Sequence, residues 1–422
     1  MSSPFHPYLC GRNAAEWLII MRNSPLLEGP LSEYEMRIQR LTTQMKLAGL
    51  DGILLSAPDN MRYFCGHRSI VWDSNVSMPG TLIVSADGRM RLAGSQSNNP
   101  TARMTACVDE DCYIAYFNGG TPEPGQTRSY REAILLAFHE LGLENGKIGM
   151  EWGRGCRVRM IHADYEAIIA GMPNATFTDA SDTIWAIRGT KSPYEVDLLR
   201  KVNAINAKLF EHAYARLIPG VTTERELYNS MAAEAYSLGC DGILEMDVRG
   251  HKSRYGLPNC PPGDEPFGTE DGTSIMIDGG PSYKGYISDI IRVGIIGKPT
   301  EEQERLYKIA LEGHAVGMSM LRPGVMISDV VAAVDDFYEK AGVSYCNHTK
   351  GWIGHSIGLN VHEYPCLEEG EHTPLKVGMV MSMEPSLDTP TAGTMCLEQN
   401  FVITENGYEL LSKTPTDLFL IH

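Results

Sequence analysis

The sequence has 422 residues, of which 43% are hydrophobic and 21% charged, a composition typical of globular proteins rather than of disordered chains. A chain of this length exceeds what one hydrophobic core usually serves, so two domains are expected. The formal net charge of -17 argues against nucleic acid as a partner, because phosphate binding needs clustered Lys and Arg side chains.

Cysteine usage and the first residues indicate a reducing compartment. The ten cysteines are scattered, without a Cys-x-x-Cys pair or the spacing of a zinc ribbon. The N-terminus lacks the basic start and apolar run of a secretory signal, and no run of about 18 apolar residues could cross a membrane. We therefore expect a cytoplasmic protein with reduced thiols and no membrane partner.

Residues 1–31 precede the first periodic segment and are expected to form an N-terminal arm. The arm contains the short apolar patch Ala15–Met21. This patch would pack either on a neighbouring subunit or on the arm's own domain, and the sequence leaves both arrangements open.

Helix and strand patterns alternate between residues 32 and 183. A Ser start, an acidic first turn, apolar residues at helical spacing and a Gly stop predict a helix from Ser32 to Gly49. The segment Pro58–Asn60 is predicted as a turn. Further patterns predict strands at Asp51–Ser56, Gly80–Val84, Tyr113–Tyr116 and Lys147–Glu151 and a helix at Tyr130–Leu141. This alternation predicts a smaller α/β domain over residues 32–183.

A hinge is expected at Ile184–Glu195, at the start of a second domain over residues 184–422. Ser192 can cap a helix, Pro193 suits the first helical position, and Glu195 completes the spacing of a capping box. A long helix is therefore predicted to follow, through His212.

The second domain contains a repeated pattern. The phrase Ile218–Thr222 (Ile-Pro-Gly-Val-Thr) stands between two helical segments, and Leu321–Val325 (Leu-Arg-Pro-Gly-Val) stands between two more. Each pair of helical segments is followed by strand-like residues, which favours two related halves. The alternative is that Pro-Gly is simply a common helix terminator.

The first half carries two carboxylates in strand-like residues. Asp278 ends the apolar run from Ser274, and Asp289 lies at the centre of a second predicted strand, Gly285–Val293. A turn at Pro281–Lys284 would form a hairpin and place both carboxylates on one face. Two like charges so placed need a proton, a cation or a metal, although such a pair is more often solvated.

The second half supplies the other candidate ligands. His355 can donate a neutral imidazole, Glu384 ends the apolar strand that starts at Gly378, and Glu398 is predicted inside a further strand, Met395–Thr404. Four carboxylates and an imidazole favour two divalent ions such as manganese, iron or cobalt over a structural zinc.

These residues resemble the motifs of the pita-bread metallopeptidase superfamily, which holds methionine aminopeptidase, aminopeptidase P, prolidase and the metal-free creatinase. The motifs are Ile277–Gly280, Gly285–Arg292, Gly354–Pro365, Gly378–Pro385 and Leu397–Thr404. The resemblance is close from Ile184 to about Ser412, and Ser56–Gly66 is similar to the N-terminal domain of the prolidase and creatinase branch. It implies an α+β pita-bread catalytic domain with internal pseudo-symmetry, preceded by a creatinase-like α/β domain.

The resemblance also implies a dinuclear metal site. Asp278 would bind one ion, Asp289 and Glu398 would bridge, and His355 and Glu384 would bind the other. The metals would be manganese first, with iron, cobalt or zinc as alternatives. In this family pattern Glu384 also counts as catalytic, and His362 would touch the substrate or the transition state; the alternative for His362 is a histidine satisfied in the wall of the site.

Three departures from the prolidase pattern concern the substrate, one of which is a slightly expanded loop from Pro258 to Phe267. Prolidases carry a histidine in the loop before the first metal strand, where this sequence has Asn259, and an amide cannot shuttle a proton. His251 is the candidate substitute in the same loop. The usual Arg-Ile-Glu-Asp phrase becomes Cys396-Leu397-Glu398-Gln399, which removes a charge pair behind the bridging glutamate.

The resulting functional prediction is a metal-dependent hydrolase of the Xaa-Pro peptidase type, in which hydroxide generated by two metal ions attacks the bond before proline. The alternative is a non-peptidase on the same metal scaffold, such as a dimethylsulfoniopropionate lyase-like enzyme or a creatinase- or ectoine hydrolase-like enzyme. In either case the substrate is a small molecule or a short peptide, and relatives with this layout imply a homodimer.

Overall fold

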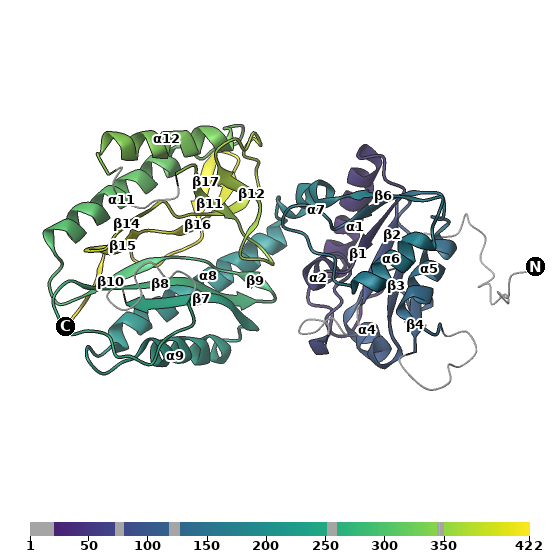
Figure 1. Cartoon of the computed structure of the whole chain (residues 1–422), viewed down its shortest axis with the longest axis horizontal. Coiled ribbons are helices and arrows are strands. Elements are labelled where there is room, and N and C mark those ends of the chain that lie inside the picture. Colours follow the sequence, from purple (N-terminus) through teal and green to yellow (C-terminus); the bar gives the residue numbers. More distant parts are fainter. Residues whose placement is uncertain (1–20, 72–79, 118–126, 251–259, 344–345, 347–349) are drawn as a thin grey trace, which may run out of the picture. The chain divides into compact units, whose positions relative to one another are not determined.

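The computed structural model describes residues 21–71, 80–117, 127–250, 260–343, 346 and 350–422. The chain divides into two compact units, Met1–Ile187 and Arg188–His422, whose elements are labelled in Figure 1. Within the described residues, none of the helices combines the length and the hydropathy needed to cross a membrane.

The described part of the first unit is built on one mixed six-stranded sheet. The strands, in spatial order, are β4 (Tyr113–Tyr116), β3 (Met90–Ser95), β2 (Thr81–Ser85), β1 (Gly52–Leu55), β5 (Lys147–Met150) and β6 (Thr176–Asp179). The helices of this unit are α1 (Leu31–Leu47), α2 (Pro58–Cys65), α4 (Asn99–Thr105), α5 (Tyr130–Leu141), α6 (His162–Ala170) and α7 (Ser181–Arg188). The apolar face of α5, which includes Ile134 and Phe138, packs into one core with Leu54 and Ile148 of the sheet.

Most predicted elements of this unit are present, but one local prediction is wrong. Residues Pro58–Asn60 form the first turn of α2 instead of an isolated turn, because Pro58 suits the first helical position and the Glu151 carboxylate accepts the Ala57 N–H. The segment predicted as a hinge, Ile184–Glu195, contains the boundary between the two compact units, which follows Ile187; helix α7 continues to Arg188, and a short connection leads from it to the next helix.

The described part of the N-terminal arm folds back on its own unit. The Arg22 N–H donates to the Cys107 carbonyl at 2.8 Å, and the Leu26 N–H donates to the Met104 carbonyl at 2.8 Å. Residues 1–20, which include most of the apolar patch, lie outside the described residues.

The second unit contains two larger sheets and a two-stranded one. The first sheet holds β18 (Phe419–Ile421), β10 (Arg292–Ile296), β8 (Thr273–Tyr283) and β7 (Gly242–Gly250), with β9 (Tyr286–Ile287) paired to β8. The second holds β12 (Glu363–Glu368), β11 (Trp352–Ser356), β13 (Val380–Met383), β16 (Gln399–Thr404) and β17 (Gly407–Leu410), and the small sheet joins β14 (Ser386–Thr389) to β15 (Gly393–Cys396).

Two helix pairs cover these sheets. Helices α8 (Pro193–Arg216) and α9 (Glu224–Ser237) pack on β8 and β7, whereas α11 (Glu301–Met320) packs on β15 and α12 (Ile327–Lys340) on β12. Figure 1 shows α11 and α12 on one side of the strand layers and α9 on the other. The strands are therefore enclosed between the helix pairs. Helix α8 begins with the predicted capping box of Ser192 and Glu195, with Pro193 in the first turn.

The two Pro-Gly-Val phrases occupy equivalent positions in the two halves. Gly220 and Gly324 both have a left-handed φ, 74° and 88°, which favours glycine. Each glycine donates its N–H to a carbonyl 2.9 Å away, Gly220 to Phe267 and Gly324 to Leu375. This shared long-range contact supports related halves over a coincidence of helix terminators.

The predicted hairpin is present, but Asp289 and Glu398 lie outside strands. The hairpin turns between Tyr283 and Tyr286, so that β10 pairs antiparallel with β8. Asp289 lies between β9 and β10 because its N–H donates to the Asn400 side chain at 3.0 Å instead of to a strand partner. Glu398 lies in the connection between β15 and β16.

Candidate metal centre

The structure brings the five predicted metal ligands together between the two large sheets of the second unit. Asp278 lies in β8, Asp289 between β9 and β10, His355 in β11, Glu384 directly after β13, and Glu398 between β15 and β16. Both halves of the unit therefore contribute side chains to one site.

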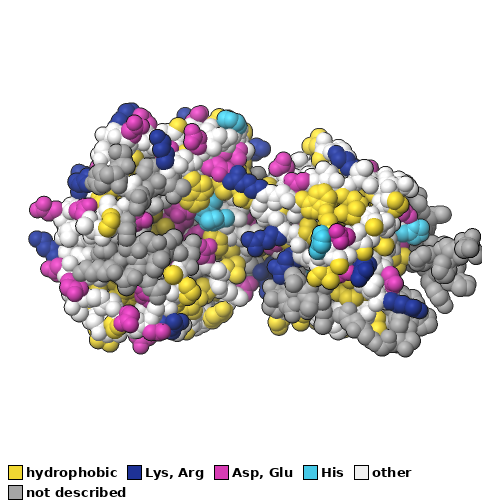
Figure 2. All heavy atoms as spheres, viewed as in Figure 1, with side chains coloured by type: hydrophobic (Ala, Val, Ile, Leu, Met, Phe, Trp, Pro, Cys, Tyr) yellow, Lys and Arg dark blue, Asp and Glu magenta, His cyan; other side chains and the backbone are white. Residues whose placement is uncertain are grey.

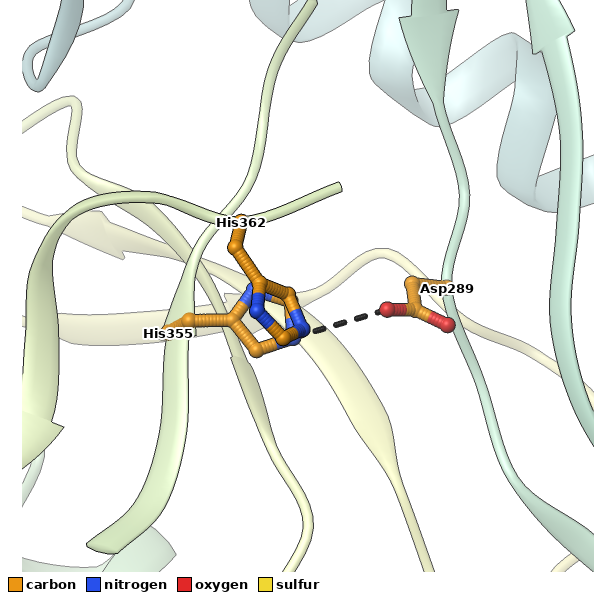
Figure 3. A group of neighbouring side chains, drawn as sticks. All are labelled: Asp289, His355 and His362. Carbon is orange, nitrogen blue, oxygen red and sulfur yellow. Dashed lines mark ion pairs between the residues drawn. The ribbon is translucent and has the colours of Figure 1, made fainter. Parts of the chain in front are cut away.

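His355 lies close to three of the candidate carboxylate ligands. Its Nε2 atom lies 3.4 Å from Asp289 Oδ2, 3.3 Å from Glu384 Oε1 and 3.9 Å from Glu398 Oε1. Figure 3 shows the contact with Asp289 and the His362 ring beside the His355 ring. The His355 Nδ1 atom lies 3.0 Å from the Ser356 carbonyl oxygen, so Nδ1 carries a hydrogen and Nε2 faces the carboxylates.

The candidate ligand atoms form overlapping groups. One atom from each of Asp278, Asp289 and Glu398 lies within 4.8 Å of the others, and the same holds for His355, Glu384 and Glu398. Glu398 belongs to both groups, and Asp289 joins the first group to His355. This arrangement allows two ions to share carboxylates.

Buried carboxylates that repel one another dominate the electrostatics of the site. Burial, reinforced by the neighbouring carboxylates, raises the pKa values of Asp278 and Glu398 well above their usual range. Burial also raises the pKa of Glu384, with Asp289 adding to the effect and His355 opposing it. Burial alone would lower the pKa of His355, but its contacts with Asp289 and Glu384 raise it to about 10. The four carboxylates repel one another until a proton or a cation is present.

Buried polar atoms that make no hydrogen bond indicate whether these residues fit divalent ions. Among the described residues, Asp289 Oδ1, His355 Nε2 and Glu398 Oε2 are buried and accept no hydrogen bond. Such atoms are costly unless a ligand satisfies them. Carboxylate oxygens with an imidazole nitrogen are donors for divalent ions such as manganese, iron, cobalt or zinc, so the residues present fit such ions.

Two supporting residues escaped the sequence analysis. Ser382 of β13 donates a hydrogen bond to Glu398 Oε1, and the Asn400 amide donates to the Asp289 carbonyl at 2.6 Å. Both side chains are fully buried. Their polarity within otherwise apolar strands could have identified them in the sequence, because a buried polar side chain in such a strand needs a hydrogen-bond partner.

His362, predicted to touch the substrate, lies next to the ligands. Its ring centroid is 4.1 Å from that of His355 and 6.0 Å from that of Trp352, and it groups with Asp289 and His355. Burial and the charge of His355 lower the pKa of His362 to about 4. The His362 side chain is nevertheless exposed. Figure 2 shows histidine, acidic and hydrophobic side chains close together on the drawn face of this unit.

The two predicted substrate-binding residues, His251 and Asn259, lie outside the described residues. Gln399, which stands where the family phrase has a carboxylate, lies within the described residues. The Arg292 guanidinium donates to Gln399 Oε1 at 3.1 Å and to the Glu398 backbone carbonyl at 2.6 Å. A neutral amide therefore stands where the family pattern has a carboxylate.

Comparison with known proteins agrees with this architecture. The family description "Metallopeptidase family M24" matches residues 197–405, and "Creatinase/Prolidase N-terminal domain" matches residues 37–189. The uncharacterized peptidase YqhT of Bacillus subtilis (strain 168) is 24% identical over 387 residues, which are 92% of this chain and all of that protein.

Solved structures show the same two-domain fold. The dipeptidase from Pyrococcus horikoshii OT3 is 25% identical with a TM-score of 0.78, and the match covers 92% of this chain and 100% of that one. The Xaa-Pro dipeptidase from Bacillus anthracis is 24% identical with a TM-score of 0.76, with the same coverage. The predicted resemblance and fold class are confirmed, and the chain belongs to metallopeptidase family M24, as a hydrolase with a creatinase/prolidase N-terminal domain ahead of its M24 domain.

Proposed function

We propose that this protein hydrolyses the peptide bond before proline in short Xaa-Pro peptides, with two divalent metal ions. The observation that carries the proposal is the pair of overlapping ligand groups joined by Asp289 and Glu398, with two buried carboxylate oxygens, Asp289 Oδ1 and Glu398 Oε2, that make no hydrogen bond with the described residues. The proline specificity draws support from the fold shared with an Xaa-Pro dipeptidase.

The residues divide into two ligand groups. Asp278 would hold one ion, Asp289 and Glu398 would lie between the two, and His355 and Glu384 would hold the second. Divalent ions held by these residues would supply an activated water and would polarise the carbonyl of the scissile bond. Ser382 and Asn400 hold Glu398 and Asp289 in place through hydrogen bonds from fixed strands.

His362 is placed to act on the substrate. An imidazole carries at least one N–H in either protonation state, so His362 can donate a hydrogen bond to the oxygen that becomes negatively charged. Its exposure and its position against His355 leave it accessible to a ligand that enters the site. Glu384, at the end of β13, is the carboxylate that would exchange a proton with the leaving group, because its Oε1 atom lies 3.3 Å from His355 Nε2 within the site.

We also propose manganese as the first metal to test, with iron, cobalt and zinc as alternatives, and a homodimer in the cytoplasm as the working form. The mixture of carboxylates and imidazole supports manganese and iron over a thiolate-selected metal. Light scattering on the full chain tests the oligomeric state, and elemental analysis tests the metal.

The decisive experiment measures turnover by the metal-reconstituted protein, with and without a chelator. The panel contains Xaa-Pro dipeptides, a tripeptide with proline second, creatine, ectoine and dimethylsulfoniopropionate. Chelator-sensitive cleavage of the proline peptides is the expected result. Turnover of only a small zwitterion would overturn the peptidase proposal and favour the non-peptidase alternative, to which the neutral Gln399 behind Glu398 already points.

A further inference from the structure

Strand β7 presents two carboxylates to the metal centre that the proposed reaction does not use. Met246 and Val248 of this strand pack into the core formed with Ile275 and Ile277. Glu245 and Asp247 alternate with them and therefore lie on the opposite face of the sheet. Asp247 pairs directly with Asp278 across the β7–β8 ladder, so this opposite face is the one that carries the candidate ligands.

The two carboxylates differ in their partners. Asp247 is 4% exposed, and its Oδ2 atom lies 3.1 Å from the Arg249 guanidinium. Glu245 is half-buried and makes no hydrogen bond or ion pair with the described residues through its side chain. Glu245 is thus a carboxylate at the edge of the site whose side chain makes no direct contact with a positively charged group among the described residues.

Glu245 is close enough to the centre to respond to its charges. Burial raises the pKa of the Glu245 carboxyl, and repulsion from Asp289 and Glu384 adds to the effect while His355 opposes it. A partly buried charge that makes no direct ion pair is costly. A cationic group that arrives with a ligand would remove this cost.

We propose that Glu245 is a specificity-determining residue that binds the positively charged amino group of the substrate. The geometry supports this role because Glu245 lies on the same face of the sheet as the candidate ligand Asp278. Among the described residues, Glu245 belongs to none of the groups in which three candidate ligand atoms lie within 4.8 Å of one another. The substrate class is then a molecule with a free cationic nitrogen near the scissile bond, such as a peptide with an uncapped N-terminus. This inference rests on the proposed function in one respect only, namely that the scissile bond is the peptide bond before proline.

The test compares ligands with and without a cationic amine. Leucine and N-acetylleucine are titrated calorimetrically into metal-reconstituted wild-type protein, Glu245→Gln, Glu245→Asp and the exposed control Glu265→Gln. A charge-assisted hydrogen bond predicts that wild type, Glu245→Asp and Glu265→Gln prefer leucine by about 10- to 100-fold, and that Glu245→Gln loses this preference. The same variants are assayed with an Xaa-Pro dipeptide and its N-acetyl derivative, for which the ratio of KM values should follow the ratio of affinities.

Two results would overturn the inference. Equal weakening of both ligands by Glu245→Gln would indicate a structural role, and a changed affinity for the metal alone would make Glu245 a ligand of the metal. Failure of the proposed function is distinguishable from these results. If no proline peptide is cleaved but the amine preference disappears in Glu245→Gln, the amine site stands and the peptidase proposal falls.

Discussion

Arg188 and Glu363 form an ion pair in which each side chain is only 1% exposed, although 175 positions separate them in the sequence. Lys191 Nζ lies 3.1 Å from the other carboxylate oxygen, Glu363 Oε2. The backbone N–H of Leu359 also donates to Glu363 Oε1 at 3.1 Å. Glu363 thus connects Arg188 and Lys191, at the start of the second unit, with the segment that contains the adjacent residue His362.

Neutralising this glutamate is expected to destabilise the second unit. Glu363→Gln keeps the shape of the side chain but leaves the buried Arg188 and Lys191 charges without a counter-charge, which costs about 3–5 kcal/mol of unfolding free energy. Urea denaturation followed by fluorescence measures the loss, with the exposed Glu369→Gln as the matched control. A variant as stable as this control would show that the ion pair contributes no net stability.

The first unit is expected to lose stability as the pH rises toward neutrality. Glu151 is 1% exposed, and burial raises its pKa to about 7, although hydrogen bonds from Asn60 and Ser56 oppose the shift. The folded state therefore binds this proton more tightly than the unfolded state, whose carboxyl has a pKa of about 4.3. The corresponding stability is fully present below pH about 4.3 and is lost as the pH rises to about 7, by about 3 kcal/mol.

Unfolding of the wild type and of Glu151→Gln between pH 5 and 8 measures this dependence. The variant carries no titratable proton at this position, so its stability should change less over the same range. Identical pH profiles would assign the dependence to other groups.

Removing one shared carboxylate is expected to separate the stability of the metal-free protein from its response to metal. In Glu398→Gln the repulsion among the buried carboxylates falls, so the metal-free Tm should equal or exceed that of the wild type. The increase in Tm on adding manganese should shrink, because a ligand that binds the folded state stabilises it by mass action. Thermal unfolding across a manganese titration measures both effects, and the exposed Glu405→Gln should behave as the wild type. An undiminished manganese response in Glu398→Gln would remove Glu398 from the ligand set.

The charge of Arg292 is expected to weaken metal binding. This guanidinium is fully buried, and among the described residues its hydrogen bonds all go to neutral acceptors: the carbonyls of Ile291, Glu398, Thr414 and Pro415 and the amide of Gln399. Gln399→Glu would supply a carboxylate 3.1 Å from the guanidinium and offset its repulsion of the ions. Coulomb's law at a protein-like dielectric predicts manganese affinity about tenfold higher.

Competition with a chelating dye measures this affinity without any turnover. Gln399→Met removes the hydrogen bond but adds no charge, so it should not tighten binding. Unchanged or weaker binding by Gln399→Glu would exclude the charge of Arg292 as the cause.

Local patterns in the sequence were sufficient for the longer helices, such as α1, α5 and α8, and for several strands. The capping box of Ser192 and Glu195 predicted the start of α8 correctly, because it depends only on residues within one helical turn. The order of the motifs likewise predicted the family and the two-domain fold, since each motif is a short contiguous segment. The wrong turn at Pro58–Asn60 has the opposite cause, because the carboxylate that favours α2 there belongs to Glu151, far along the chain.

The tertiary structure alone decided how the site is assembled. Asp289 leaves its strand because Asn400, 111 positions away, takes its N–H, and Glu245 faces the ligands because Met246 and Val248 occupy the core. The hydrogen bond of Arg292 with the neutral Gln399 side chain and the ion pair of Glu363 with Arg188 likewise join residues that lie far apart in the sequence. Contacts of this kind join distant segments, and their geometry exists only after both halves of the unit have packed, so no local pattern in the sequence encodes it.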